Sequence, residues 1–117
     1  MVKIKNGSAD WCMFGSISPK LGIIFFEFAL LMKRRKVDNL VITSIIRDKS
    51  ANDTGIHMLG RAVDISLGGI SKKIAQEVAD IINALYPYGK GKSTVIIHTG
   101  NGYKGDCAEH IHLQSNE

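Results

Sequence analysis

The sequence predicts an α+β fold: a small, mainly antiparallel sheet with flanking helices. Two segments carry apolar residues at helical spacing, while several shorter runs alternate or are rich in β-branched residues. The chain has 117 residues, of which 44% are apolar and 22% charged. These values are typical of a globular protein, so we expect one domain over residues 1–117 and exclude a disordered or low-complexity chain.

The first helix is expected from Ser18 to about Lys36. Serine is a favourable N-cap, and Pro19 suits the first helical position. Apolar residues then recur at spacings of three and four, at Leu21, Ile24, Phe25, Phe28 and Met32. Further apolar residues occupy the other faces, namely Ile23, Phe26, Leu30 and Leu31. We therefore expect this helix to be buried on most sides.

Two strands are expected after this helix, separated by a polar loop over residues 48–56. Residues 40–43 form a short apolar run, which is typical of a buried strand. Residues 62–67 alternate between apolar and polar side chains. This alternation predicts a half-buried strand with Asp64 on its polar face.

The C-terminal half is expected to hold a second helix and two more strands. The helix runs from Ser71 to Leu85 and carries one apolar stripe, formed by Ile74, Val78, Ile81, Ile82 and Leu85. A buried strand is expected at 94–98, followed by a Gly-rich loop at 99–108. The last strand, 110–114, places its alternate residues His110, His112 and Gln114 on one face.

Charge and composition narrow the function classes. The net charge of +4 favours an anionic partner such as a nucleic acid, a lipid surface or a cell-wall polymer. Much of the excess lies in one basic run, residues 33–36, which is typical of a solvated helix end. No aromatic residues interleave with that run, so nucleic-acid binding is disfavoured.

Membrane insertion and a disulfide framework are also disfavoured. The most apolar stretch, residues 21–32, is too short to span a membrane and contains Glu27. Residues 1–10 lack the apolar core of a signal peptide, so we expect synthesis in a cytoplasm. There the two cysteines, Cys12 and Cys107, are expected to stay as free thiols.

Histidine and carboxylate residues suggest a zinc site. His57 lies at the end of a loop with Asp64 seven residues later, and His112 follows Glu109 by three residues. Three such ligands would leave a fourth zinc position open for water, as in catalytic sites. Glu109 would then be the base that accepts a proton from that water. On spacing alone, any single histidine is better explained as an ordinary polar residue at a strand end.

Three motifs in this order carry a family resemblance: Thr43-Ser-Ile-Ile-Arg47, His57-Met-Leu-Gly-Arg-Ala-Val-Asp64 and Glu109-His-Ile-His112. Together they resemble the zinc D-Ala-D-Ala peptidase family. That family includes D-alanyl-D-alanine carboxypeptidases and phage L-alanyl-D-glutamate endolysins, and it shares its fold with the Hedgehog signalling domain. The resemblance therefore implies a Hedgehog/DD-peptidase-like fold.

The resemblance also implies residue roles. His57, Asp64 and His112 would bind Zn²⁺, and Glu109 would act as general base and then general acid. Arg47 would stabilise the oxyanion or hold a substrate carboxylate. The chain departs from the family at residue 55, where glycine replaces the usual serine or threonine. The loop between the arginine and the first histidine is also short, which affects substrate contacts more than the metal.

Other candidate ligands receive different interpretations. In a regular strand His110 and His112 share a face, and such a pair can bind one metal. The resemblance selects His112 and leaves His110 as a hydrogen-bonding group beside the metal. His98 could line the cleft, but it is interpreted as a satisfied strand-end residue. Cys107 is interpreted as a free thiol in a Gly-rich loop.

The expected function is zinc-dependent hydrolysis of peptidoglycan stem peptides by a monomeric phage or prophage endolysin. Without a secretion signal, such an enzyme would act on the wall after release by a partner that permeabilises the membrane. One alternative is a carboxypeptidase of the same family. Another is a non-catalytic zinc-binding module of the same fold, although such a module would need no general base at Glu109.

Overall fold

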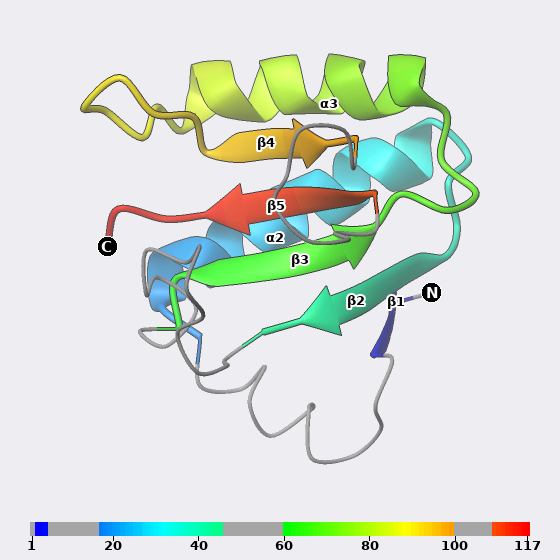
Figure 1. Cartoon of the computed structure of the whole chain (residues 1–117), viewed down its shortest axis with the longest axis horizontal. Helices are drawn as coiled ribbons and strands as arrows, with labels where there is room; N and C mark the ends of the chain where they lie inside the picture. The colour runs from blue at the N-terminus through cyan, green and yellow to red at the C-terminus, as the bar shows by residue number, and fades with distance from the viewer. Residues whose placement is uncertain (1, 5–16, 46–59, 100–108) are drawn as a thin grey trace.

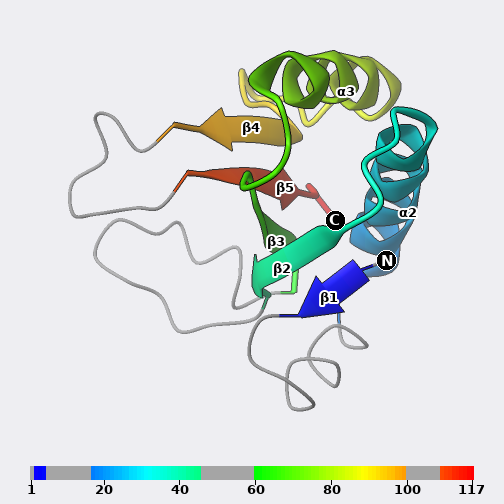
Figure 2. The same ribbon diagram turned by 90° about the vertical axis from the view of Figure 1, so that its right-hand side faces the viewer.

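The computed structural model describes residues 2–4, 17–45, 60–99 and 109–117. These residues form a five-stranded sheet with two helices on one side of it (Figures 1 and 2). The elements in chain order are β1 (Val2–Ile4), α2 (Pro19–Arg34), β2 (Leu40–Ser44), β3 (Ala62–Ser66), α3 (Lys72–Leu85), β4 (Val95–His98) and β5 (His110–Gln114). The α+β class is therefore confirmed as a small compact domain with a mixed sheet.

The strand order is β1-β2-β3-β5-β4. Strands β2, β3, β5 and β4 pair antiparallel, as expected, whereas β1 pairs parallel with β2. Strand β1 was not expected, because three residues are too few to show an alternating pattern. Strand β1 is defined by its pairing with β2, which lies nearly forty residues later in the sequence; Val2, for example, lies opposite Leu40.

Helix α2 begins where its cap residues predict. The Ser18 hydroxyl accepts a hydrogen bond from the Leu21 amide at 3.2 Å, and proline fills the first position. One face of the helix packs against the sheet, but Ile23 and Phe26 are 56% and 64% exposed. The expectation of burial on most sides was therefore wrong. The sheet lies along only one side of α2, so the opposite face meets solvent (Figure 2).

Helix α3 also begins at its predicted cap, where the Ser71 hydroxyl accepts from the Ile74 amide at 3.1 Å. Its buried face is narrower than the predicted stripe and consists of Ala75, Val78, Ala79 and Ile82. Leu85, expected on that face, is 58% exposed. It is the last residue of the helix.

Strand β4 lies at one end of the described strand order, and within Val95–His98 only Val95 is buried. The prediction of a buried strand was therefore too strong.

Strand β3 lies at the centre of the sheet, paired with β2 on one side and β5 on the other. All residues from Ala62 to Ile65 are buried, including Asp64 at 7% exposure. The predicted half-buried strand is thus buried on both faces. Gly60 precedes it with a φ of 67°, a left-handed turn that glycine adopts readily, and its carbonyl accepts from the Ser18 amide at 2.8 Å.

A single apolar cluster joins the helices to the sheet. Its largest fully buried side chains come from both helices and from the three central strands, and include Phe28, Leu21, Met32, Ile82, Ile42, Ile65 and Ile111. Within the described part of the chain, no helix has the length and apolar character needed to cross a membrane.

Candidate metal centre

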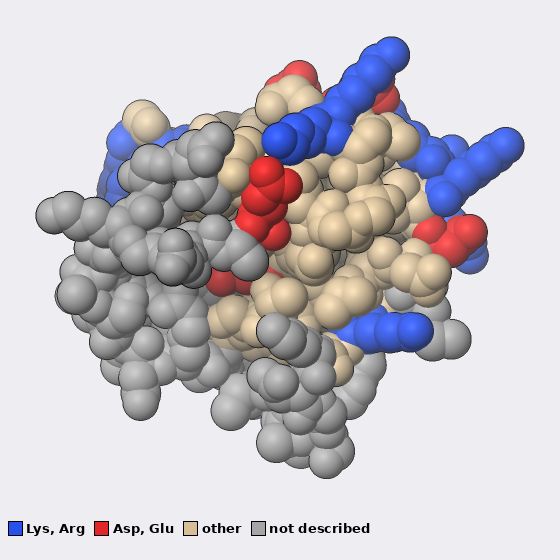
Figure 3. All heavy atoms as spheres, turned by 45° about the vertical axis from the view of Figure 1, so that its right-hand side comes forward, with Lys and Arg blue, Asp and Glu red and all other residues tan. Residues whose placement is uncertain are grey.

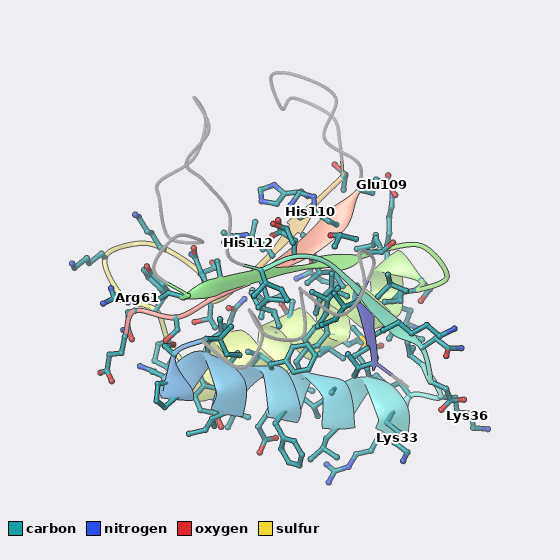
Figure 4. The ribbon with its side chains drawn as sticks, turned by 90° about the horizontal axis from the view of Figure 1, so that it is seen from below. Lys33, Lys36, Arg61, Glu109, His110 and His112 are labelled. Atoms are coloured by element: carbon teal, nitrogen blue, oxygen red, sulfur yellow. The ribbon has the colours of Figure 1, made fainter. Side chains whose placement is uncertain are left out.

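Asp64 and His112 meet because their strands are neighbours. In the antiparallel register of β3 and β5 these two residues are direct partners. Direct partners present their side chains on the same face of a sheet, with Cβ atoms about 4.5–5.5 Å apart. That face is the one opposite α2, and His110 and His112 project from it (Figure 4). Two separate sequence motifs are thus brought to one point by strand pairing.

The contact between them is short and largely shielded from solvent. Asp64 Oδ1 lies 2.8 Å from His112 Nδ1 and 3.8 Å from His110 Nε2. The three side chains are only 10–14% exposed. Low exposure strengthens the electrostatic interaction between a carboxylate and any cationic partner.

His98 joins the same group from β4. Its ring centroid lies 4.7 Å from that of His110 and 6.1 Å from that of His112. Burial lowers the pKa of His98, and the neighbouring His110 and His112 lower it further, while Asp64 opposes the shift. We call Asp64, His98, His110 and His112 the Asp–His cluster. Strand pairing places His98, the last residue of β4, directly opposite His110, so this strand-end residue lies among the other histidines.

Gln114 is a residue whose role the sequence did not reveal. Its side-chain oxygen lies 3.1 Å from His112 Nε2, and its amide nitrogen donates to the carbonyl of Ser93 at 2.7 Å. Gln114 itself is buried, at 7% exposure. The sequence feature that could have indicated this contact is the position of Gln114, two residues after His112 and therefore on the same face of the strand.

Glu109 lies immediately before β5, beside the cluster residues of that strand (Figure 4). Its side chain is 47% exposed, and its carboxylate lies 3.4 Å from the Lys72 ammonium at the start of α3. Such an exposed pair contributes about 0–1 kcal/mol to stability, so it orients the carboxylate more than it stabilises the fold. Lys72 was not expected at the site.

Several predicted site residues lie outside the described residues. They include His57 and Arg47, so the third expected ligand and the substrate cation are not placed. Gly55, the two cysteines Cys12 and Cys107, and most of the Gly-rich loop 99–108 also lie outside. Among the residues that are described, no group of three His, Cys, Asp or Glu side chains is arranged to hold a metal ion.

Asp64 and His112, two of the three expected ligands, lie close enough together to be neighbouring ligands of one zinc ion. Carboxylate oxygen and imidazole nitrogen are both regular zinc ligands. Two ligands at about 2.0–2.1 Å from a tetrahedral zinc lie about 3.3 Å apart. The Asp64–His112 pair, at 2.8 Å, would have to open by about 0.5 Å, a shift that small side-chain rotations supply.

Comparison with known proteins adds no further identification. No protein-family model matches the chain, and neither the curated proteins nor the solved structures include a significant match.

Proposed function

We propose that this protein is a zinc-dependent peptidase that hydrolyses peptidoglycan stem peptides, as an endolysin of the L-alanyl-D-glutamate type. In this proposal it has the Hedgehog/DD-peptidase-like fold of the zinc D-Ala-D-Ala peptidases. The observation that carries the proposal is the contact of Asp64 with His112, which lie 48 residues apart in the sequence. Two motifs recognised separately thus contribute neighbouring zinc donors.

In this proposal Asp64 and His112 hold zinc together with His57. Zinc would polarise the scissile carbonyl and lower the pKa of a bound water molecule. Glu109 would accept a proton from that water and later donate it to the leaving amine. Its exposure suits this role, because a proton carrier at the rim reaches both solvent and substrate. Lys72 would hold the carboxylate in place before substrate arrives.

On one face of the described part of the chain, the charge distribution lacks the continuous basic area that nucleic-acid binding would need. On the face seen in Figure 3, basic side chains project separately around a largely uncharged area rather than forming one continuous patch. A nucleic-acid interface would instead need clustered Lys and Arg along a groove or stripe.

The test is product analysis by mass spectrometry on purified sacculi and on a synthetic stem peptide ending in D-Ala-D-Ala. We expect new termini at L-Ala and D-Glu, abolished by chelator and by Glu109→Gln. Release of D-Ala alone would reassign the protein as a carboxypeptidase. Zinc-loaded protein that cleaves neither substrate would point to a non-catalytic zinc-binding module.

A further inference from the structure

Helix α2 carries apolar side chains on the side that faces away from the sheet. Ile23, Phe26 and Leu30 are spaced by three and four residues, so they lie on one face of the helix. Ile23 is 56% and Phe26 64% exposed, and Leu30 is half-buried. Among the described residues, only one other large apolar side chain, that of Leu85, is exposed. We call Ile23, Phe26 and Leu30 the outer stripe.

Three exposed basic residues lie at the C-terminal end of the outer stripe. Lys33 and Arg34 belong to the last turn of α2, and Lys36 follows the helix. Helical spacing places Lys33 and Arg34 on the two flanks of the outer stripe, about one turn beyond its last residue. The fourth basic residue of this run, Arg35, instead pairs with Glu77 of α3 at 3.3 Å. Exposed positive charge therefore surrounds one end of the apolar surface.

Acidic residues are few around this surface. Glu27 is the only acidic residue of α2 and is half-buried, and Asp38 is the next acidic residue along the chain. Lys20, near the other end of the helix, adds a further positive charge and donates a hydrogen bond to Asn116 at 2.6 Å. The surface around the outer stripe is therefore net positive.

The outer stripe and the Asp–His cluster lie on opposite sides of the sheet. In Figure 4, α2 runs below the sheet with Lys33 and Lys36 at its C-terminal end, whereas His110 and His112 project above the sheet. A partner bound to the outer stripe would therefore leave the face with the histidines uncovered.

We propose that the outer stripe and the basic end of α2 dock onto an anionic lipid surface. The helix lies in the plane of the headgroups, with Phe26 and Ile23 entering the apolar boundary and the cations contacting lipid phosphates. No helix among the described residues could cross a membrane, so this attachment is peripheral. The inference goes beyond the proposed peptidase function and does not depend on it.

The charge pattern disfavours a second copy of the chain as the partner. Two copies related by a two-fold axis present the same surface to each other. If their α2 helices ran parallel, the two basic ends would meet. If the helices ran antiparallel, Lys33 and Arg34 would meet the end that carries Lys20. Neither arrangement supplies acidic partners for the basic end, whereas an anionic membrane supplies a negative surface.

Co-sedimentation of the full chain with lipid vesicles tests this proposal. One set of vesicles is pure phosphatidylcholine, and the other contains about one third phosphatidylglycerol, which supplies negative charge. We expect binding to the anionic vesicles that is at least about 10-fold tighter than binding to the neutral ones. Added salt should weaken it, because salt screens the attraction. Equal binding to both kinds of vesicle, or binding to neither, overturns the proposal.

The apolar contribution is tested by Phe26→Ala, with Leu85→Ala as the matched control. Both variants lose a large exposed side chain, but Leu85 lies on α3, outside the outer stripe. Phe26→Ala should weaken binding to anionic vesicles by about 10-fold, because less apolar surface leaves water on docking. Leu85→Ala should bind like the wild type. Equal affinity of the two variants overturns the proposal.

The basic contribution is tested by the double variant Lys33→Gln with Arg34→Gln. Affinity for anionic vesicles should fall by about 25-fold, since each basic residue near such a surface contributes about 5-fold. The control is Lys90→Gln with Lys92→Gln, which changes the net charge equally at two exposed residues between α3 and β4. This control should lose much less affinity. If both double variants bind equally, net charge alone drives binding and the proposal is overturned.

Sedimentation velocity of the lipid-free protein tests the other occupant of the outer stripe. We expect a monomer in both wild type and Phe26→Ala. A wild-type dimer that Phe26→Ala dissociates would assign the outer stripe to a second copy of the chain and overturn the proposal. The substituted side chains are exposed, so the variants should keep the wild-type urea midpoint. None of them is a proposed zinc ligand or base, so failure of lipid binding leaves the peptidase proposal standing.

Discussion

Asn83 should contribute measurably to stability although it lies far from the apolar centre. It projects from α3 onto β4, which among the described strands pairs with β5 alone. Its amide oxygen accepts from the Val95 amide at 2.8 Å, and its amide nitrogen donates to the Val95 carbonyl at 3.2 Å. The side chain thus takes the place of a further strand and satisfies both backbone groups of Val95.

The cost of Asn83→Ala follows from these two bonds. Each contributes about 0.5–1.5 kcal/mol net, so losing both costs about 1–3 kcal/mol. Alanine is the better helix former by about 0.6 kcal/mol, which offsets part of that loss. We expect a net destabilisation of about 1.5 kcal/mol, which lowers the urea midpoint by about 0.5–1.5 M.

Urea unfolding and amide hydrogen exchange measure this effect together. The Val95 amide should exchange faster in Asn83→Ala, because its acceptor is removed. The control is Gln76→Ala on the same helix, since the bond that Gln76 makes to Asp80 is exposed. It should shift the midpoint little. If the two variants are equally stable and Val95 exchange is unchanged, the reasoning about the strand edge is refuted.

Three further predictions concern the core, the metal and the base. Phe28→Ala should lower the free energy of unfolding by about 3–5 kcal/mol, because Phe28 is fully buried. Phe26→Ala, at an exposed site, should change it by no more than about 0.5 kcal/mol. If calorimetry gave equal effects for the two variants, the orientation of α2 would be contradicted. Zinc at 100 times its dissociation constant should raise the free energy of unfolding by about 2.7 kcal/mol, and chelator should reverse this; identical melting curves would exclude a tightly bound ion. Glu109→Gln should lower hydrolysis by a factor on the order of 100 or more while zinc content stays constant; loss of zinc would instead make Glu109 a ligand.

Features set by local sequence were predicted well. Both helices begin at their serine caps, because a cap bond spans only three residues and depends little on the rest of the fold. Strand β5 was also predicted, with His112 and Gln114 on one face. The alternation of a strand is a local property of the backbone.

Features set by distant contacts were not predicted. The exposure of Phe26 depends on where the sheet lies, and helical spacing alone does not contain that information. The burial of Asp64 follows from the central place of β3, which requires the pairing of both neighbouring strands. His98 and Gln114 enter the site through β4 and Ser93, which come from a different part of the chain.

The most direct test of the metal site is the zinc content of purified protein after dialysis against metal-free buffer. We expect about one zinc per chain in wild type, and none in Asp64→Ala or His112→Ala. His98→Ala serves as the matched control, because it removes a neighbouring imidazole of the Asp–His cluster that is not a proposed ligand, and it should keep its zinc. A wild-type protein without zinc, or a His112→Ala variant that keeps zinc while His98→Ala loses it, would contradict the account.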